Sequence, residues 1–181
     1  MIVIDSGSVL NLQISHFTEP KKQEEIRLLD LKRVCGSVKS IDVFRQDIVV
    51  WDKKRKIYVP QPTRFWILDR DIRAKISRLE EKGYIACFSE KISTDESLFS
   101  FFITLHEREI EERIKIFKEK YPQFLDDPRF SVLLDKNVGI GGIRDFKEKP
   151  FKVKCLHLWT AYHSGDKRFE NPIGEFVLKN I

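Results

Sequence analysis

Hydrophobic and polar positions follow a helical spacing in two segments of the chain. The first predicts a helix over residues 69–83, with Asp69 as its N-cap and Gly83 at the position of a left-handed C-terminal cap. Residues three and four positions apart share one face of a helix, and that face is apolar here. Its members are Ile72, Ile76 and Leu79.

A second apolar stripe predicts a helix over residues 104–121. Thr104 and Glu107 have the spacing of a capping box, and Pro122 ends the helix. We expect His106, in the first turn, to lie on the surface, and we interpret the charged far side as a solvated face rather than a carboxylate catalytic cluster. The stripe consists of Ile110, Ile114, Phe117 and Tyr121, and the charged side of Glu107, Arg108, Glu109, Glu111, Glu112 and Arg113.

Runs of β-branched residues predict strands earlier in the chain. Residues 41–50 and 56–68 flank a charged connection at 52–55, which is the pattern of a β-hairpin. Pro60 and Pro62 have no N–H to donate, so part of the second arm should lie at an edge or a bulge.

Three further segments are shorter. Residues 84–88 predict a short strand, and residues 98–103 are compatible with a buried strand or with the start of a helix. Residues 153–163 favour a third helix, around 154–164 and ending at Gly165, with a strand start as the alternative. A last short element follows Pro172.

Together these elements predict a single α+β domain over residues 1–181, in which an antiparallel sheet with a β-hairpin is covered by about three helices. The polar stretch at residues 18–25 resembles a linker, so residues 1–25 are a candidate N-terminal arm.

Composition narrows the class of protein. The chain has 181 residues, of which 41% are hydrophobic, and this excludes a wholly disordered chain. No stretch approaches the ~18 consecutive apolar residues of a membrane-spanning helix, and the first residues lack the pattern of a secretory signal. Three dispersed cysteines, Cys35, Cys87 and Cys155, cannot form a closed disulfide framework. We therefore expect a cytoplasmic protein with no membrane partner.

The formal net charge of +5 could indicate nucleic-acid binding, which requires positive charge gathered on one face. The basic residues are instead divided between the hairpin tip at 53–56, balanced helix faces and a local excess over residues 144–154. We therefore expect a small anionic ligand rather than a nucleic acid. The sequence does not identify a protein partner.

The local excess of positive charge adjoins a glycine-rich loop at residues 137–145. Glycines at three positions let backbone N–H groups converge on an anion, and a guanidinium and an ammonium follow. The loop lacks the Gly-Lys-Ser/Thr ending of a P-loop and the third glycine of the dinucleotide fingerprint. A tight turn with locally paired charges is the alternative. The candidate anion-binding residues are Gly139, Gly141, Gly142, Arg144 and Lys154.

Cys155 and His157, followed by His163, supply a thiol and imidazoles, the side chains of nucleophilic and zinc sites. On a regular helix Cys155 and His157 point to nearly opposite sides, whereas on an extended segment they share a face. The pair is therefore a candidate catalytic pair if the chain is extended there. Core packing of Cys155 with the residues that follow it is the alternative.

Near the C-terminus the chain carries, in order, Gly139-Ile-Gly-Gly-Ile-Arg-Asp145, Val153-Lys-Cys-Leu-His157 and Asn171-Pro-Ile-Gly174. An earlier block carries Pro60-Gln-Pro-Thr-Arg-Phe-Trp-Ile-Leu68 and then Ile76-Ser-Arg-Leu-Glu80 followed by Gly83. Together these blocks, within about residues 33–177, resemble the DUF501 family, a bacterial domain of unknown function. The resemblance implies no established activity and draws attention to the loop at 139–145, the Cys-Leu-His motif and residues 171–174.

The sequence departs from that family at several positions. Asp69 stands where the family tends to have a cysteine, and Cys35 lies in a segment similar to the family's Arg-Cys-Pro. By this resemblance Cys35, Asp69, Cys155 and His157 would make a four-ligand metal set if folding brought them together. The sequence indicates no other cofactor.

Two functions of different class follow. In the first, the loop at 139–145 holds an anionic, phosphate-type ligand through Arg144, with Cys155 or His157 beside it as the reactive group. In the second, the same motifs are structural and the domain is a non-catalytic interaction module, which the family's genetic neighbourhood would associate with bacterial cell division. The first requires these groups to line one concave pocket.

Overall fold

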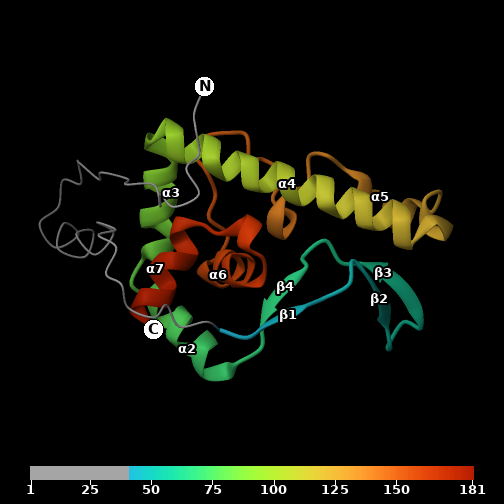
Figure 1. The fold of residues 1–181 in the computed structure, drawn as a ribbon, viewed down its shortest axis with the longest axis horizontal. Coiled ribbons are helices and arrows are strands. Elements are labelled where there is room, and N and C mark those ends of the chain that lie inside the picture. Colours follow the sequence, from blue (N-terminus) through green and yellow to red (C-terminus); the bar gives the residue numbers. More distant parts are fainter. Residues whose placement is uncertain (1–40) are drawn as a thin grey trace, which may run out of the picture. The chain divides into compact units, whose positions relative to one another are not determined.

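The computed structural model describes residues 41–181 of the chain (Figure 1). The candidate arm at residues 1–25 and Cys35 lie outside the described residues. The strands of the described part are β1 (Val43–Arg45), β2 (Val49–Asp52), β3 (Ile57–Pro60) and β4 (Phe65–Ile67). Its α-helices are α2 (Arg70–Glu81), α3 (Tyr84–Thr94), α4 (Glu96–Lys120), α5 (Ser131–Leu134), α6 (Leu156–Gly165) and α7 (Pro172–Asn180).

The strands form two antiparallel pairs, so the predicted α+β class is confirmed. β2 and β3 are the predicted hairpin, with the basic turn 53–56 at its tip. β1 pairs with β4, placing Phe44 directly opposite Trp66. The two arms therefore pair in two separate ladders, β2 with β3 and β1 with β4. The ladder is interrupted between β3 and β4, in the segment that contains Pro62, because a proline cannot donate a hydrogen bond to a strand ladder.

The strand predicted at residues 84–88 is wrong, because this segment begins α3. Tyr84 and Phe88 lie one helical turn apart and both pack on Phe176 of α7, with ring centroids 4.6 and 5.3 Å from it. A short apolar run has no periodicity that separates a strand from a buried helix, so the partner helix decides. Gly83 is left-handed, with φ of 87°, and separates α2 from α3 as its position predicted.

The long helix α4 begins at Glu96 rather than at Thr104. Asp95 is its N-cap and accepts a hydrogen bond from the backbone N–H of Leu98. Residues 98–103 are therefore helical, which settles the alternative left open by the sequence. Thr104 does not cap the helix, since its hydroxyl donates to the carbonyl of Ser100 one turn earlier.

The solvated face predicted on α4 is wrong at two positions. Glu109 is fully buried and pairs with Arg64, which is 1% exposed and reaches it from the segment before β4, with Nη2 and Oε2 2.7 Å apart. Arg113, one turn after Glu109, is also buried and donates to the carbonyls of Leu133 and Asp135. These contacts connect α4 to distant segments, which a charge pattern along one helix does not reveal.

The predicted surface position of His106 is also wrong, because its side chain in α4 is completely buried. Its Nδ1 accepts a hydrogen bond from the backbone N–H of Ile140, and its ring stacks on Phe146. Trp159 packs edge-on against the imidazole ring from another side. Burial among aromatic rings lowers the pKa of His106 to about 3, so the imidazole is neutral at pH 7.

This neutral histidine should make the protein acid-sensitive. As pH falls below about 6.5, a histidine in the unfolded chain takes up a proton, while His106 in the folded protein does not until about pH 3. Stability should therefore fall by up to about 1.4 kcal/mol per pH unit across this window. We expect His106→Asn, whose amide oxygen can accept the Ile140 bond, to show a shallower decline in urea unfolding between pH 6 and 4. Equal slopes would contradict the assignment.

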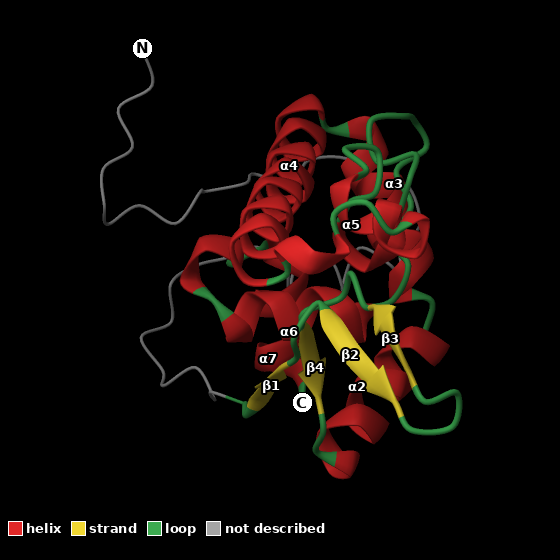
Figure 2. Ribbon diagram, turned by 90° about the vertical axis from the view of Figure 1, so that its right-hand side faces the viewer, coloured by secondary structure: helices red, strands yellow, loops and turns green. Residues whose placement is uncertain are grey.

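α6 occupies the centre of the described residues, with α4 on one side and β1 and β4 on another (Figures 1 and 2). Trp159 and Tyr162 of α6 are completely buried and form much of the core. None of the helices between residues 41 and 181 has the length and apolar character needed to cross a membrane.

Candidate functional site

Cys155 and His157 come together where an extended segment turns into α6. The third helix was predicted from residue 153 or 154, but it begins at Leu156, and Cys155 is its N-cap with φ of −165° and ψ of 157°. The Cys155 Sγ accepts a hydrogen bond from the backbone N–H of Leu158, at 3.4 Å. Because the chain is extended up to Cys155 and helical after it, the Cys155 sulfur and a ring nitrogen of His157 lie within 4.8 Å of each other.

Glu80, near the end of α2, joins this pair. Its Oε1 accepts a hydrogen bond from the backbone N–H of Leu156, at 2.7 Å, and lies 3.0 Å from Nδ1 of His157. Nε2 of His157 lies 3.0 Å from the backbone carbonyl oxygen of Arg73, also on α2. Glu80 therefore orients the imidazole and fixes the start of α6 against α2.

The sequence alone predicts no role for Glu80. It belongs to the Arg-Leu-Glu motif that carries the family resemblance, and this was the one available signal. Its position beside the Cys-Leu-His motif results from helix packing between residues far apart in the chain.

His157 is positively charged at neutral pH in this arrangement. The side-chain hydrogen bond with Cys155 is the largest cause that raises its pKa to about 9, followed by the carbonyl of Arg73 and the carboxylate of Glu80, while partial burial opposes them. Both ring nitrogens then act as donors, Nδ1 to Glu80 and Nε2 to Arg73.

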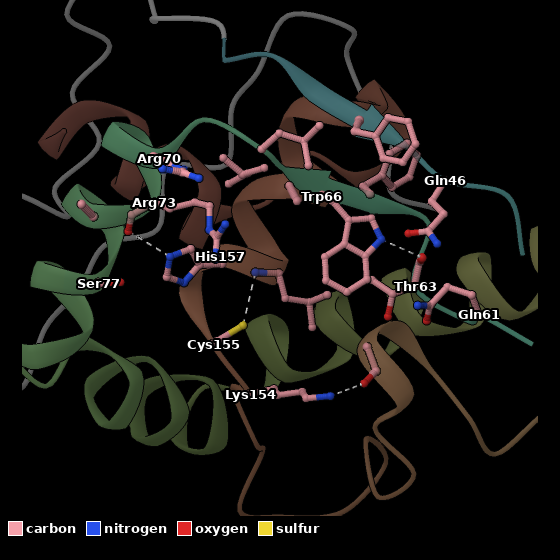
Figure 3. Close-up of a pocket in the computed structure, with 18 residues that line it drawn as sticks. Gln46, Gln61, Thr63, Trp66, Arg70, Arg73, Ser77, Lys154, Cys155 and His157 are labelled. Carbon is pink, nitrogen blue, oxygen red and sulfur yellow. Dashed lines mark hydrogen bonds between the residues drawn. The ribbon is translucent and has the colours of Figure 1, made fainter. Parts of the chain in front are cut away.

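A pocket of about 1010 Å³ opens beside the pair (Figure 3). Cys155 and His157 lie on one wall of it. The opposite wall is largely apolar: Trp66, whose indole N–H donates to the carbonyl of Thr63, stands within it, and Gln46, Gln61 and Thr63 add polar groups beside it. The apolar members of this wall are Phe44, Phe65, Trp66, Ile67 and Leu68, while Leu158 lines the pocket from α6.

Three cations line the pocket close to the Cys155–His157 wall. Arg70 and Arg73 come from the first turns of α2, and Lys154 precedes the N-cap of α6. None of the three forms an ion pair with another residue of the 41–181 segment; Lys154 Nζ donates to the carbonyl of Gly141, at 2.7 Å. The wall that carries the thiol and the imidazole is thus strongly positive.

The glycine-rich loop takes only a small part in the pocket. Gly141 lines it, and a Cβ there would lie 2.3 Å from Leu158, so this glycine permits the close contact with α6. Gly139 packs on His106, and its N–H donates to the carbonyl of Ile143. The N–H of Gly142 donates to the carbonyl of Gly139. Two of the three predicted anion donors are therefore engaged within the loop.

Arg144 lies on the surface and is not among the residues lining the pocket. Its Nη1 pairs with the carboxylate of Asp135, at 2.8 Å, on a side chain that is 64% exposed. Lys154 and Gly141 are thus the predicted anion-binding residues that the structure places beside Cys155 and His157.

The metal set suggested by resemblance is only partly assembled. Asp69 caps α2 by accepting from the N–H of Ile72, at 2.9 Å, and Cys35 lies outside the described residues. His163 accepts a hydrogen bond from the N–H of Asn171 and joins a different part of the fold. Within residues 41–181, ligand atoms of Glu80, Cys155 and His157 all lie within 4.8 Å of one another and could hold a metal ion.

The fold and this site define a small α+β domain with a pocket at the junction of α2, α6 and the β1–β4 pair. The chain belongs to the DUF501 family, described as a protein of unknown function, which matches residues 33–179. No curated protein and no solved structure matches the chain.

Proposed function

We propose that the pocket binds a small molecule that has an anionic group and an apolar part, and that Cys155 and His157 act on the ligand held there. The observation that carries this proposal is the opposition of two walls. One presents Arg70, Arg73 and Lys154 around the thiol and imidazole, and the other presents aromatic and aliphatic side chains.

The cationic wall suits a phosphate or carboxylate. Guanidinium groups bind such anions in a bidentate manner, and the absence of carboxylate partners within the described residues leaves these cations available. The half-exposed indole of Trp66 across the pocket can cover a ring or an aliphatic chain.

Thermal unfolding in the presence of three probes tests this proposal. Ligand binding to the folded state raises its apparent stability, so phenylphosphonate should raise Tm more than inorganic phosphate or phenol alone. Arg73→Ala and Lys154→Ala should reduce the shift, while Lys147→Ala, which removes a surface cation paired with Glu107, should leave it unchanged. Equal shifts in all variants would refute the proposal.

The exposed rim of the apolar wall favours one alternative, a non-catalytic interaction module. Phe44, Trp66 and Leu68 are 49%, 40% and 62% exposed, and a protein partner could cover them. A protein partner bound there would contact these exposed apolar side chains and would not need Arg70, Arg73 or Lys154. Loss of probe binding in Trp66→Ala with full retention in Arg73→Ala would favour it.

A further inference from the structure

We propose that Glu80, Cys155 and His157 form a three-ligand site for a divalent zinc-type ion, with its fourth position open toward the pocket. The three side chains come from two elements, the last turns of α2 and the start of α6. Their ligand atoms lie within 4.8 Å of one another. In a tetrahedral zinc site neighbouring ligand atoms are about 3–4 Å apart, so small side-chain rotations suffice to close the site.

The donor set fits zinc chemically. A thiolate, an imidazole and a carboxylate are its usual protein ligands, and three protein ligands with one open position are typical of catalytic rather than structural zinc. The thiolate and carboxylate together carry two negative charges, which balance a divalent cation in a wall otherwise lined by arginine and lysine.

The groups around these side chains already have the arrangement of an outer shell. Nε2 of His157 donates to the carbonyl oxygen of Arg73, 3.0 Å away, so on binding the ion Nδ1 would release the proton that it donates to Glu80 while Nε2 keeps its own. Metal-bound histidines usually make such a bond to a carbonyl with the nitrogen that does not bind the ion. The N–H groups of Leu156 and Leu158 likewise hold the Glu80 oxygen and the Cys155 sulfur in place.

The open position indicates how the ion would serve the pocket. Cys155 and His157 line the pocket, whereas Glu80 stands behind them, so the uncovered side of the site faces the bound molecule. There the ion would accept the anionic group of the ligand or a water. This last step rests on the proposed function, but binding of the metal itself does not.

Cobalt(II) titration of the metal-stripped full-length protein tests the site. One equivalent should give a thiolate-to-cobalt charge-transfer absorption together with intense visible bands of tetrahedral cobalt, and zinc should displace it. Cys155→Ser should abolish the charge-transfer absorption. Glu80→Gln and His157→Ala should weaken cobalt binding by more than about 10-fold, the lower range for loss of an outer-shell partner.

Cys87→Ala is the matched control, because it removes a thiol of α3 outside the site and should leave the absorption intact. Circular dichroism and Tm without metal identify variants that remain folded, and zinc should raise the Tm of the wild type but not of folded Cys155→Ser. Absence of charge transfer in the wild type, or its persistence in Cys155→Ser, would overturn the metal site. Cobalt binding without phenylphosphonate binding would instead overturn only the proposed function.

Discussion

Replacement of Glu109 by alanine is expected to destabilise the protein by about 3–5 kcal/mol. The substitution leaves the guanidinium of Arg64 buried without its carboxylate, since Arg64 is 1% exposed and Glu109 accepts bonds from both its Nε and its Nη2. The cost comes mainly from the unpaired buried charge rather than from the lost attraction. Urea unfolding of the variant at pH 7 measures it.

Glu112→Ala is the matched control on the same helix. Glu112 pairs with the half-exposed Arg168, so its loss should cost at most about 1 kcal/mol. The double variant Arg64→Met/Glu109→Leu should recover much of the stability lost in Glu109→Ala, because the buried charge of Arg64 is removed together with its partner. If Glu109→Ala and Glu112→Ala have equal effects, the buried pair does not have the role assigned to it.

Trp159→Ala is expected to cost about 3–5 kcal/mol by opening a cavity in the core. Trp159 is completely buried in α6, and its ring packs edge-on against Phe102 and His106. The same helix carries His157 at its start, so the variant should also lose binding of phenylphosphonate. Denaturant unfolding and a binding titration on the same samples measure both effects.

Trp66→Ala separates the pocket from the core. This indole is 40% exposed, so its loss should change stability by less than about 1 kcal/mol while weakening ligand binding. A large loss of stability in Trp66→Ala, or a small one in Trp159→Ala, would contradict the division between apolar wall and core.

The elements with a strong local signal were predicted well from the sequence. α2 has a regular apolar face, a capping aspartate and a terminal glycine, and the structure places it at Arg70–Glu81. The hairpin was recognised because its basic turn separates two β-branched runs. In both elements the residues that define the structure are neighbours in the chain.

Elements defined by distant partners were not predictable in this way. Residues 84–88 became helical because Phe176 packs on that face, and Glu109 is buried because Arg64 reaches it from the segment before β4. No periodicity within either segment contains this information. The same reason explains why His106, in a polar helical turn, could not be recognised as a core residue.

The candidate site was predictable in part. The chemistry of Cys155, His157, Gly141 and Lys154 predicts a site, and all four residues line the pocket. The same chemistry predicts Arg144 as a member, but Arg144 pairs with Asp135 on the surface. Arg70 and Arg73 of α2, which the proposal uses in place of Arg144, belong to no motif, and their place beside the pocket results from the packing of α2 against α6.

Titration calorimetry with phenylphosphonate tests the central claim, that this pocket binds an anionic molecule with an apolar part. The wild type should bind one equivalent, and Arg73→Ala and Trp66→Ala, on opposite walls, should each weaken binding by at least about 10-fold, or 1.4 kcal/mol. Lys147→Ala should bind as the wild type does. Absence of binding to the wild type, or equal affinity in Arg73→Ala and Lys147→Ala, would contradict the claim.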